Sequence, residues 1–160
     1  MELVVLAVRV ADSRQGTAAR YAERNRRGLP ARFTMTAGYD AGFRVLADVA
    51  AEAERQAVVD SVVVLRCDGH VLYRNERIAA VRWLRCPGAA LAVAAEQSRS
   101  CTSGEAARFW SVQRQLRSAM PHCCGEFIAI ERLARPLVSL PLRRRRRSAV
   151  ACVAALPASV

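Results

Sequence analysis

One stretch of the chain constrains the fold more than any other. Ala57–Leu65 contains five valines in nine residues, and β-branched side chains of this kind favour an extended, pleated backbone. The turn-forming sequence Cys67-Asp68-Gly69-His70 follows, and the apolar pattern then resumes at Val71–Tyr73. An apolar run, a turn with glycine and a second apolar run predict a β-hairpin.

Further strands are predicted on both sides of this hairpin. Leu3–Val10 is rich in valine and ends in turn formers, which is typical of a strand. Ile78–Leu84 and Ala89–Ala94 are read as short strands, although the alanine-rich second segment fits a helix equally well. Gly125–Pro136 is read as a late strand that its proline closes.

Helices are predicted at fewer places. Thr102-Ser103-Gly104-Glu105 has the spacing of a capping box, and apolar residues with a roughly helical period follow it at Phe109, Val112, Leu116 and Met120. Asp12–Gly28 is read as a surface loop or a short helix over 18–26, and Ala47–Gln56 is left open between helix and strand. Together these patterns predict a mainly β fold, a sandwich, barrel or jelly roll with one or two short helices.

Length and composition indicate one domain with a tail. The 160 residues suffice for a single hydrophobic core, and we expect the domain to span 1–140 and an arginine-rich, apolar-ended tail to span 141–160. The formal charge is +11, every basic residue is arginine, and lysine is absent. GC-rich coding explains the arginines most simply, while a strongly basic chain also attracts phosphates, nucleic acid or acidic proteins.

The cysteines predict neither a disulfide framework nor a metal site. The six cysteines form no CxxC pair, and His122-Cys123-Cys124 lacks the second spaced pair that a zinc site needs. No apolar leader follows Met1-Glu2, so we expect a reduced intracellular location, in the nucleus or cytoplasm of a host cell.

The tail has its own pattern. The run Arg143, Arg144, Arg145, Arg146 and Arg147 fits a nuclear-import signal, an anion or nucleic-acid contact, or a solvated linker. The apolar end after it is too short to cross a bilayer, and no transmembrane segment is predicted.

Three segments in order resemble motifs of the dUTPase superfamily. Leu29-Pro30 followed by Ala37-Gly38-Tyr39-Asp40 resembles the first motif. Gly69 to Glu76 resembles the second, with Arg74 retained and Asn75 in place of a phosphate-binding serine. Gly125-Glu126-Phe127-Ile128-Ala129 resembles the fourth. The resemblance implies the all-β dUTPase-like jelly roll.

The same resemblance implies a nucleotide site that has lost its chemistry. Arg74, Asn75, Gly125 and Glu126 are the implied nucleotide-binding residues, and Asp40 is the implied catalytic carboxylate if the protein is active. Asp40 also fits a turn aspartate, and Arg74 also fits a solvated strand face. The region matching the third motif, 87–96, has alanines and Leu91 where the family has an aspartate and a tyrosine, and an alkyl side chain cannot activate water.

We therefore expect a degenerate dUTPase-like protein without useful hydrolysis and without a cofactor. Similar accessory proteins occur in adenoviral early regions and in herpesviruses, which implies binding to host or viral proteins. The alternative is an active dUTP diphosphatase that requires Mg²⁺ and a homotrimer. A third hypothesis is an arginine-rich nucleic-acid-binding protein.

Overall fold

The computed structural model describes residues 1–31, 36–56, 58–79 and 82–138. The predicted tail over 141–160, with its arginine run, lies outside these residues. In chain order, the elements are β1 (Glu2–Leu6), α1 (Val10–Arg26), α2 (Thr36–Arg44), α3 (Leu46–Gln56), β2 (Ser61–Leu65), β3 (Val71–Ala79), β4 (Arg82–Trp83), α4 (Ala89–Ser98), α5 (Ser103–Ala119), a short 3₁₀ turn (Pro121–Cys123) and α6 (Cys124–Ala134).

The strands form one mixed sheet in the order β1-β2-β3-β4. β1 pairs with β2 in parallel, and β2 pairs with β3 in antiparallel orientation, with Val63 opposite Arg74. The β2–β3 pair confirms the predicted hairpin, and Gly69 adopts a φ of 84° in its turn, a conformation that glycine tolerates best. The first predicted strand is confirmed over Glu2–Leu6.

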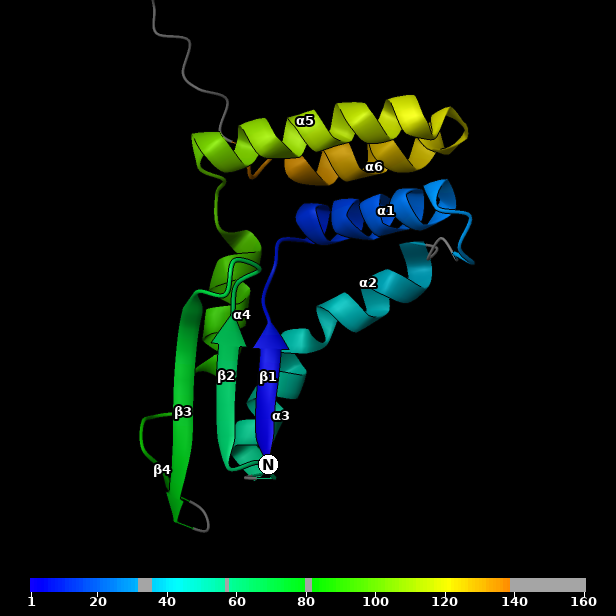
Figure 1. Ribbon diagram of the computed structural model, residues 1–160. Helices are drawn as coiled ribbons and strands as arrows, with labels where there is room; N and C mark the ends of the chain where they lie inside the picture. Colours follow the sequence, from blue (N-terminus) through cyan, green and yellow to red (C-terminus); the bar gives the residue numbers. More distant parts are fainter. Residues whose placement is uncertain (32–35, 57, 80–81, 139–160) are drawn as a thin grey trace, which may run out of the picture.

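Two hydrophobic clusters hold the molecule together. In the first, α3 and α4 cover one face of the sheet, with Ala50, Ala53 and Val93 packed against strand residues such as Val62 and Val64. The second lies among α1, α5 and α6 and is built on larger side chains, Phe109, Leu116, Phe127 and Ile130. Figure 1 shows these three helices as a layer across the ends of β1 and β2, above the sheet.

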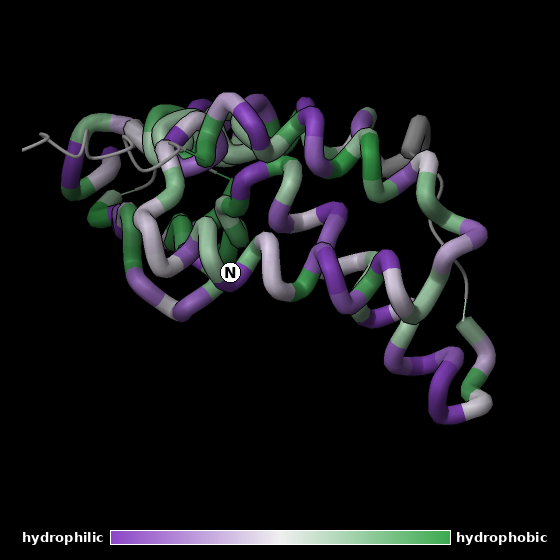
Figure 2. The backbone as a smooth tube through the Cα atoms, turned by 90° about the horizontal axis from the view of Figure 1, so that it is seen from above, coloured by the Kyte–Doolittle hydropathy of each residue, from purple (hydrophilic) through white to green (hydrophobic). Residues whose placement is uncertain are grey.

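The expectation of a mainly β jelly roll is wrong, because helices dominate the described residues. The segment read as a loop or short helix forms the 17-residue α1. Its inward face carries Ala11, Ala18 and Gln15, so the contrast between its apolar and polar faces is weak. Figure 2 shows how hydrophilic and hydrophobic segments alternate along the helices seen from above.

The predicted late strand over 125–136 is also wrong, since most of it belongs to α6. Its buried residues are Phe127, Ile130 and Ala134, a spacing of three and four that matches a helical period rather than strand alternation. The segment 89–94, read as strand or helix, is helical in α4. The capping-box helix is confirmed, because Thr102 and Glu105 cap α5 reciprocally.

Candidate functional site

The carboxyl ends of β1 and β2 border a cavity between the sheet and the helical layer. After β1 the chain passes through Ala7–Arg9 into α1, and after β2 it passes through Arg66–Asp68 into the hairpin turn. Because the two strands are parallel, both connections lie at the same end of the sheet. A cavity of about 590 Å³ lies there, and residues of α5 form part of its wall. Open α/β sheets bind their ligands at such carboxyl ends.

Charged side chains dominate the wall of this cavity. Four arginines and four carboxylates line it: Arg9, Arg66, Arg99, Arg108, Asp12, Asp68, Glu96 and Glu105. They come from both strand ends, from α1, from the end of α4 and from α5. We call these eight residues the charged ring.

Arg9 links the first strand to α5. It is only 7% exposed, and its guanidinium bonds to Asp12 in the first turn of α1 and to Glu105, the latter at 3.4 Å. Burial is the largest single effect and lowers the pKa of Arg9, but the hydrogen bonds and charges of Asp12, Cys101 and Glu105 together outweigh it, and the pKa is raised. A buried arginine that keeps its charge is therefore fixed beside the cavity.

Glu105 is held by several donors at once. Arg99 donates to its two carboxylate oxygens at 2.6 and 3.0 Å, and the backbone N–H of Thr102 donates at 2.7 Å. The bonds from Arg99 lower the pKa of Glu105 far below its ordinary value, with the Thr102 N–H and Arg9 adding to the effect. The same pairing raises the pKa of Arg99. Both groups therefore stay charged at neutral pH.

Glu96 extends the ring toward the second strand. Arg66 donates to its two oxygens at 3.0 and 2.9 Å, and the Nε of Arg99 donates to them at 3.1 and 3.0 Å. Burial raises the pKa of Glu96, but these arginines overcome that effect and the pKa is lowered. An alternating series of carboxylates and guanidiniums thus runs from Asp12 to Asp68.

Arg108 differs from the other three arginines of the ring. It is exposed at the surface of α5, and among the described residues no carboxylate is assigned to it as a salt-bridge partner. The cavity is also bordered by the N-terminal turns of α1 and α5, whose backbone N–H groups favour negative charge. Cys67 lies in the same wall, where burial and nearby carboxylates raise the pKa of its thiol.

The residues expected from the dUTPase resemblance are not brought together. Asp40 lies on α2 and forms an ion pair with Arg14 of α1. Arg74 lies on β3, exposed and bonded to Glu76. Gly125 and Glu126 lie at the start of α6, in the helical layer rather than in the sheet. None of these residues lines the cavity at the strand ends.

Asn75 has a structural environment in the sheet. It is buried, and its amide donates to Glu54 at 3.2 Å, to the hydroxyl of Tyr73 at 2.8 Å and to the carbonyl of Arg85 at 3.0 Å. Its carbonyl oxygen accepts the backbone N–H of Arg85 at 3.0 Å. With these partners the side chain has no spare group directed toward a ligand.

Sequence reasoning missed the charged ring. Its members Arg9, Arg66 and Arg99 are far apart along the chain, and only the pairing of β1 with β2 places the first two at one edge. One usable signal was present, since Arg9 and Arg66 each come shortly after a valine-rich strand. No group of three potential metal ligands occurs among the residues that the structure describes.

The fold and this cavity define a class: an α/β protein with a charged cavity at the carboxyl ends of paired parallel strands. The Zeta toxin family model matches residues 1–78 of the chain. The matched segment runs from β1 into β3 and contains Arg9, Asp12, Arg66 and Asp68. No curated protein and no solved structure matches the chain.

This match overturns the dUTPase resemblance. The first and second motifs that carried it lie inside the segment that resembles Zeta toxins, and the helical fold has no jelly roll to support it. The expected viral accessory role and the alternative dUTP diphosphatase activity rested on that resemblance and are withdrawn with it. Among the described helices, none is both long and apolar enough to span a lipid bilayer.

Proposed function

We propose that this chain binds a phosphorylated small molecule, a nucleotide or a sugar phosphate, in the cavity beside β1 and β2. The observation that carries the proposal is the arginine-lined cavity at the carboxyl edge of the sheet, half of whose charged ring falls within the Zeta toxin-like segment. Zeta toxins are a P-loop kinase-like family, and kinases of that kind act on phosphate-bearing substrates.

The chemistry of the ring suits a ligand with two kinds of polar group. Guanidinium groups bind phosphate oxygens through paired N–H donors, and Arg108 presents such a group without a salt-bridge partner among the described residues. The N-terminal turn of α5 adds backbone donors nearby. Carboxylates such as Asp12 and Asp68 suit the hydroxyl groups of a sugar, which donate hydrogen bonds to them.

The residues present do not fit the triphosphate-binding loop of P-loop kinases. That loop requires the pattern GxxxxGK[ST] after a strand, and the 160 residues contain no lysine. The connection from β1 to α1 reads Ala7-Val8-Arg9, without a glycine that lets a phosphate approach the backbone. These residues therefore support ligand binding and do not supply the phosphate-binding loop that phosphoryl transfer uses in P-loop kinases.

Isothermal titration calorimetry with ADP, ribose 5-phosphate and adenosine tests the proposal. We expect the two phosphorylated compounds to bind and adenosine to fail, because Arg108 has no carboxylate partner among the described residues and its guanidinium binds the phosphate. Arg108→Ala should weaken binding by roughly tenfold, the effect of losing a charge-assisted hydrogen bond of about 1.5 kcal/mol. Arg114→Ala is the matched control, since Arg114 is exposed on the same helix but does not line the cavity. Equal losses in the two variants, or no binding of phosphorylated compounds, would contradict the proposal.

A further inference from the structure

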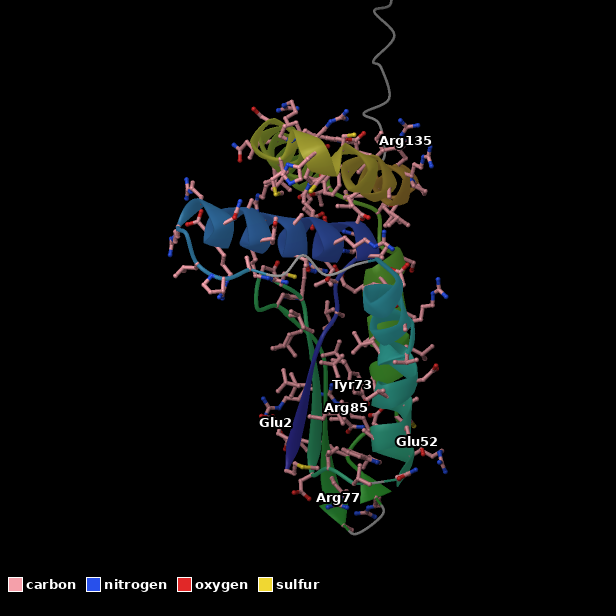
Figure 3. All side chains as sticks on the ribbon, turned by 90° about the vertical axis from the view of Figure 1, so that its right-hand side faces the viewer. Glu2, Glu52, Tyr73, Arg77, Arg85 and Arg135 are labelled. Atoms are coloured by element: carbon pink, nitrogen blue, oxygen red, sulfur yellow. The ribbon has the colours of Figure 1, made fainter. Side chains whose placement is uncertain are left out.

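β1 lies at one edge of the sheet. Within the part of the chain that the structure describes, it is the outermost strand of the order β1-β2-β3-β4 and pairs with β2 alone. Figure 3 looks onto this side of the molecule, and there β1 is the strand nearest the viewer with no helix drawn across it. An edge strand offers its unpaired backbone N–H and C=O groups to another strand.

The hydrogen bonds to β2 identify which residues offer these groups. The N–H of Ala7 donates to the carbonyl of Leu65 at 2.7 Å, and the carbonyl of Met1 accepts from Asp60 at 2.7 Å. The backbone N–H and C=O groups of the odd-numbered residues of β1 therefore point toward β2. Because successive residues of a strand alternate in direction, Glu2, Val4 and Leu6 direct both their N–H and C=O groups outward.

The side chains of the same three residues lie on the uncovered face of the sheet. Val4 is 54% exposed and Leu6 is 52% exposed, whereas Val5 between them is 3% exposed and belongs to the core. Figure 3 shows Glu2 on the side of the sheet away from α3. β1 has no proline and no bulge in its register with β2, which are two of the devices that protect edge strands from association.

We propose that two copies of this chain associate through the outer edges of their β1 strands. In an antiparallel pair with its two-fold axis at Val4, Val4 faces Val4 of the second copy and Leu6 faces Glu2 of the second copy. Every residue in these pairs has its N–H and C=O directed outward, so each pair exchanges two backbone hydrogen bonds. The interface uses the same surface of both copies, as a two-fold dimer requires.

The side-chain pattern favours a second copy as the occupant of this edge. The exposed valine at the centre meets its own apolar counterpart, and such cross-strand pairs stabilise antiparallel sheets. The two Glu2 carboxylates lie at opposite ends of the ladder and do not oppose each other. Each copy carries a formal charge of +11, so the copies repel at low ionic strength and dimerisation should increase with added salt.

Sedimentation equilibrium of the full chain tests the proposal, with amide hydrogen exchange to locate the interface. We expect a monomer–dimer equilibrium that shifts toward dimer as salt is added, together with slowed exchange of the Val4 and Leu6 amides in the dimer. Val4→Arg should abolish the dimer, because it places two positive charges side by side. Val71→Arg is the control and should keep it, since Val71 is 49% exposed but lies on β3.

Thermal unfolding of both variants checks that they fold. A chain that stays monomeric at high protein and salt concentration overturns the proposal. Association without protection of the Val4 and Leu6 amides, or association that Val71→Arg weakens as much as Val4→Arg, also overturns it, because another surface would then be responsible. The ligand site plays no part in this test.

Discussion

The hydroxyl of Tyr73 donates a 2.7 Å hydrogen bond to the carboxylate of Glu54, which is only 3% exposed. The other oxygen of Glu54 accepts the backbone N–H groups of Gly88 at 3.0 Å and Ala89 at 2.9 Å. One side chain of α3 therefore joins β3 to the first turn of α4. Figure 3 shows Tyr73 on the side of the sheet that faces α3, where this connection is made.

Replacing Glu54 by glutamine should destabilise the fold. An amide group offers one acceptor oxygen where the carboxylate offers two, so at least one buried N–H or O–H loses its partner. We expect the free energy of unfolding to fall by about 2–3 kcal/mol, measured by urea denaturation. Glu52→Gln is the control, because Glu52 forms an exposed ion pair with Arg55 and solvent screens such pairs, so its loss should change stability little. Similar losses in both variants would show that the Glu54 network does not support the fold.

Tyr73 should make the protein sensitive to high pH. Burial raises the pKa of Tyr73 to about 12, and the bond to Glu54 adds to the effect. A group whose pKa is raised in the folded state stabilises the fold below its unfolded pKa, about 10 for tyrosine, and this contribution is lost as pH rises through the folded value. We expect the urea midpoint to fall between about pH 10 and pH 12, and the fall to be smaller in Tyr73→Phe. If the urea midpoint of Tyr73→Phe falls as steeply with pH as that of the wild type, Tyr73 is not the titrating group.

The charged ring should make the fold lose stability as pH falls into the acid range. Hydrogen bonds from Arg99, first of all, lower the pKa of Glu105 in the folded state. A lowered pKa gives stability that is fully present above the unfolded value, about 4.3 for glutamate, and that is lost as pH falls toward the folded value. The urea midpoint should therefore decrease from about pH 5 downward.

Glu105→Gln separates this contribution from general acid denaturation. The variant should be less stable than the wild type at pH 7, and the difference should shrink as pH falls toward 3. Glu23→Gln, which removes an exposed partner of Arg26, should change the pH 7 midpoint little. A difference between Glu105→Gln and the wild type that stays constant with pH would contradict the assignment.

Local signals in the sequence predicted the hairpin and one helix well. The valines of β2 and the Asp-Gly turn act within a few residues, and so do the cap residues Thr102 and Glu105, so no tertiary contact is needed to recognise them. The helix α1 is different, because its buried face is made of small residues such as Ala11 and Ala18. Its apolar residues therefore show only a weak helical periodicity in the sequence. Packing against α5 and α6 stabilises this helix.

The site was harder to predict than the elements. Arg9 and Arg66 lie at the same end of the sheet only because β1 and β2 are adjacent and parallel. The sequence pattern of a strand does not show which other strand it pairs with. Arg99 joins them from the end of α4, a segment whose alanines fitted a strand or a helix equally well. The arginine run 143–147 and the nuclear or cytoplasmic location lie outside what the described residues address, and both stay predictions.

The most direct test of the proposed ligand site is a ¹H–¹⁵N NMR titration of the full chain with ADP. The proposal predicts saturable shifts concentrated in Arg9–Asp12, Arg66–Asp68 and Arg99–Arg108, with Arg108→Ala reducing them and Arg114→Ala leaving them intact. Shifts confined to arginines elsewhere in the chain, or spread evenly over its basic surface without saturation, would contradict a phosphate-ligand site at the carboxyl ends of β1 and β2.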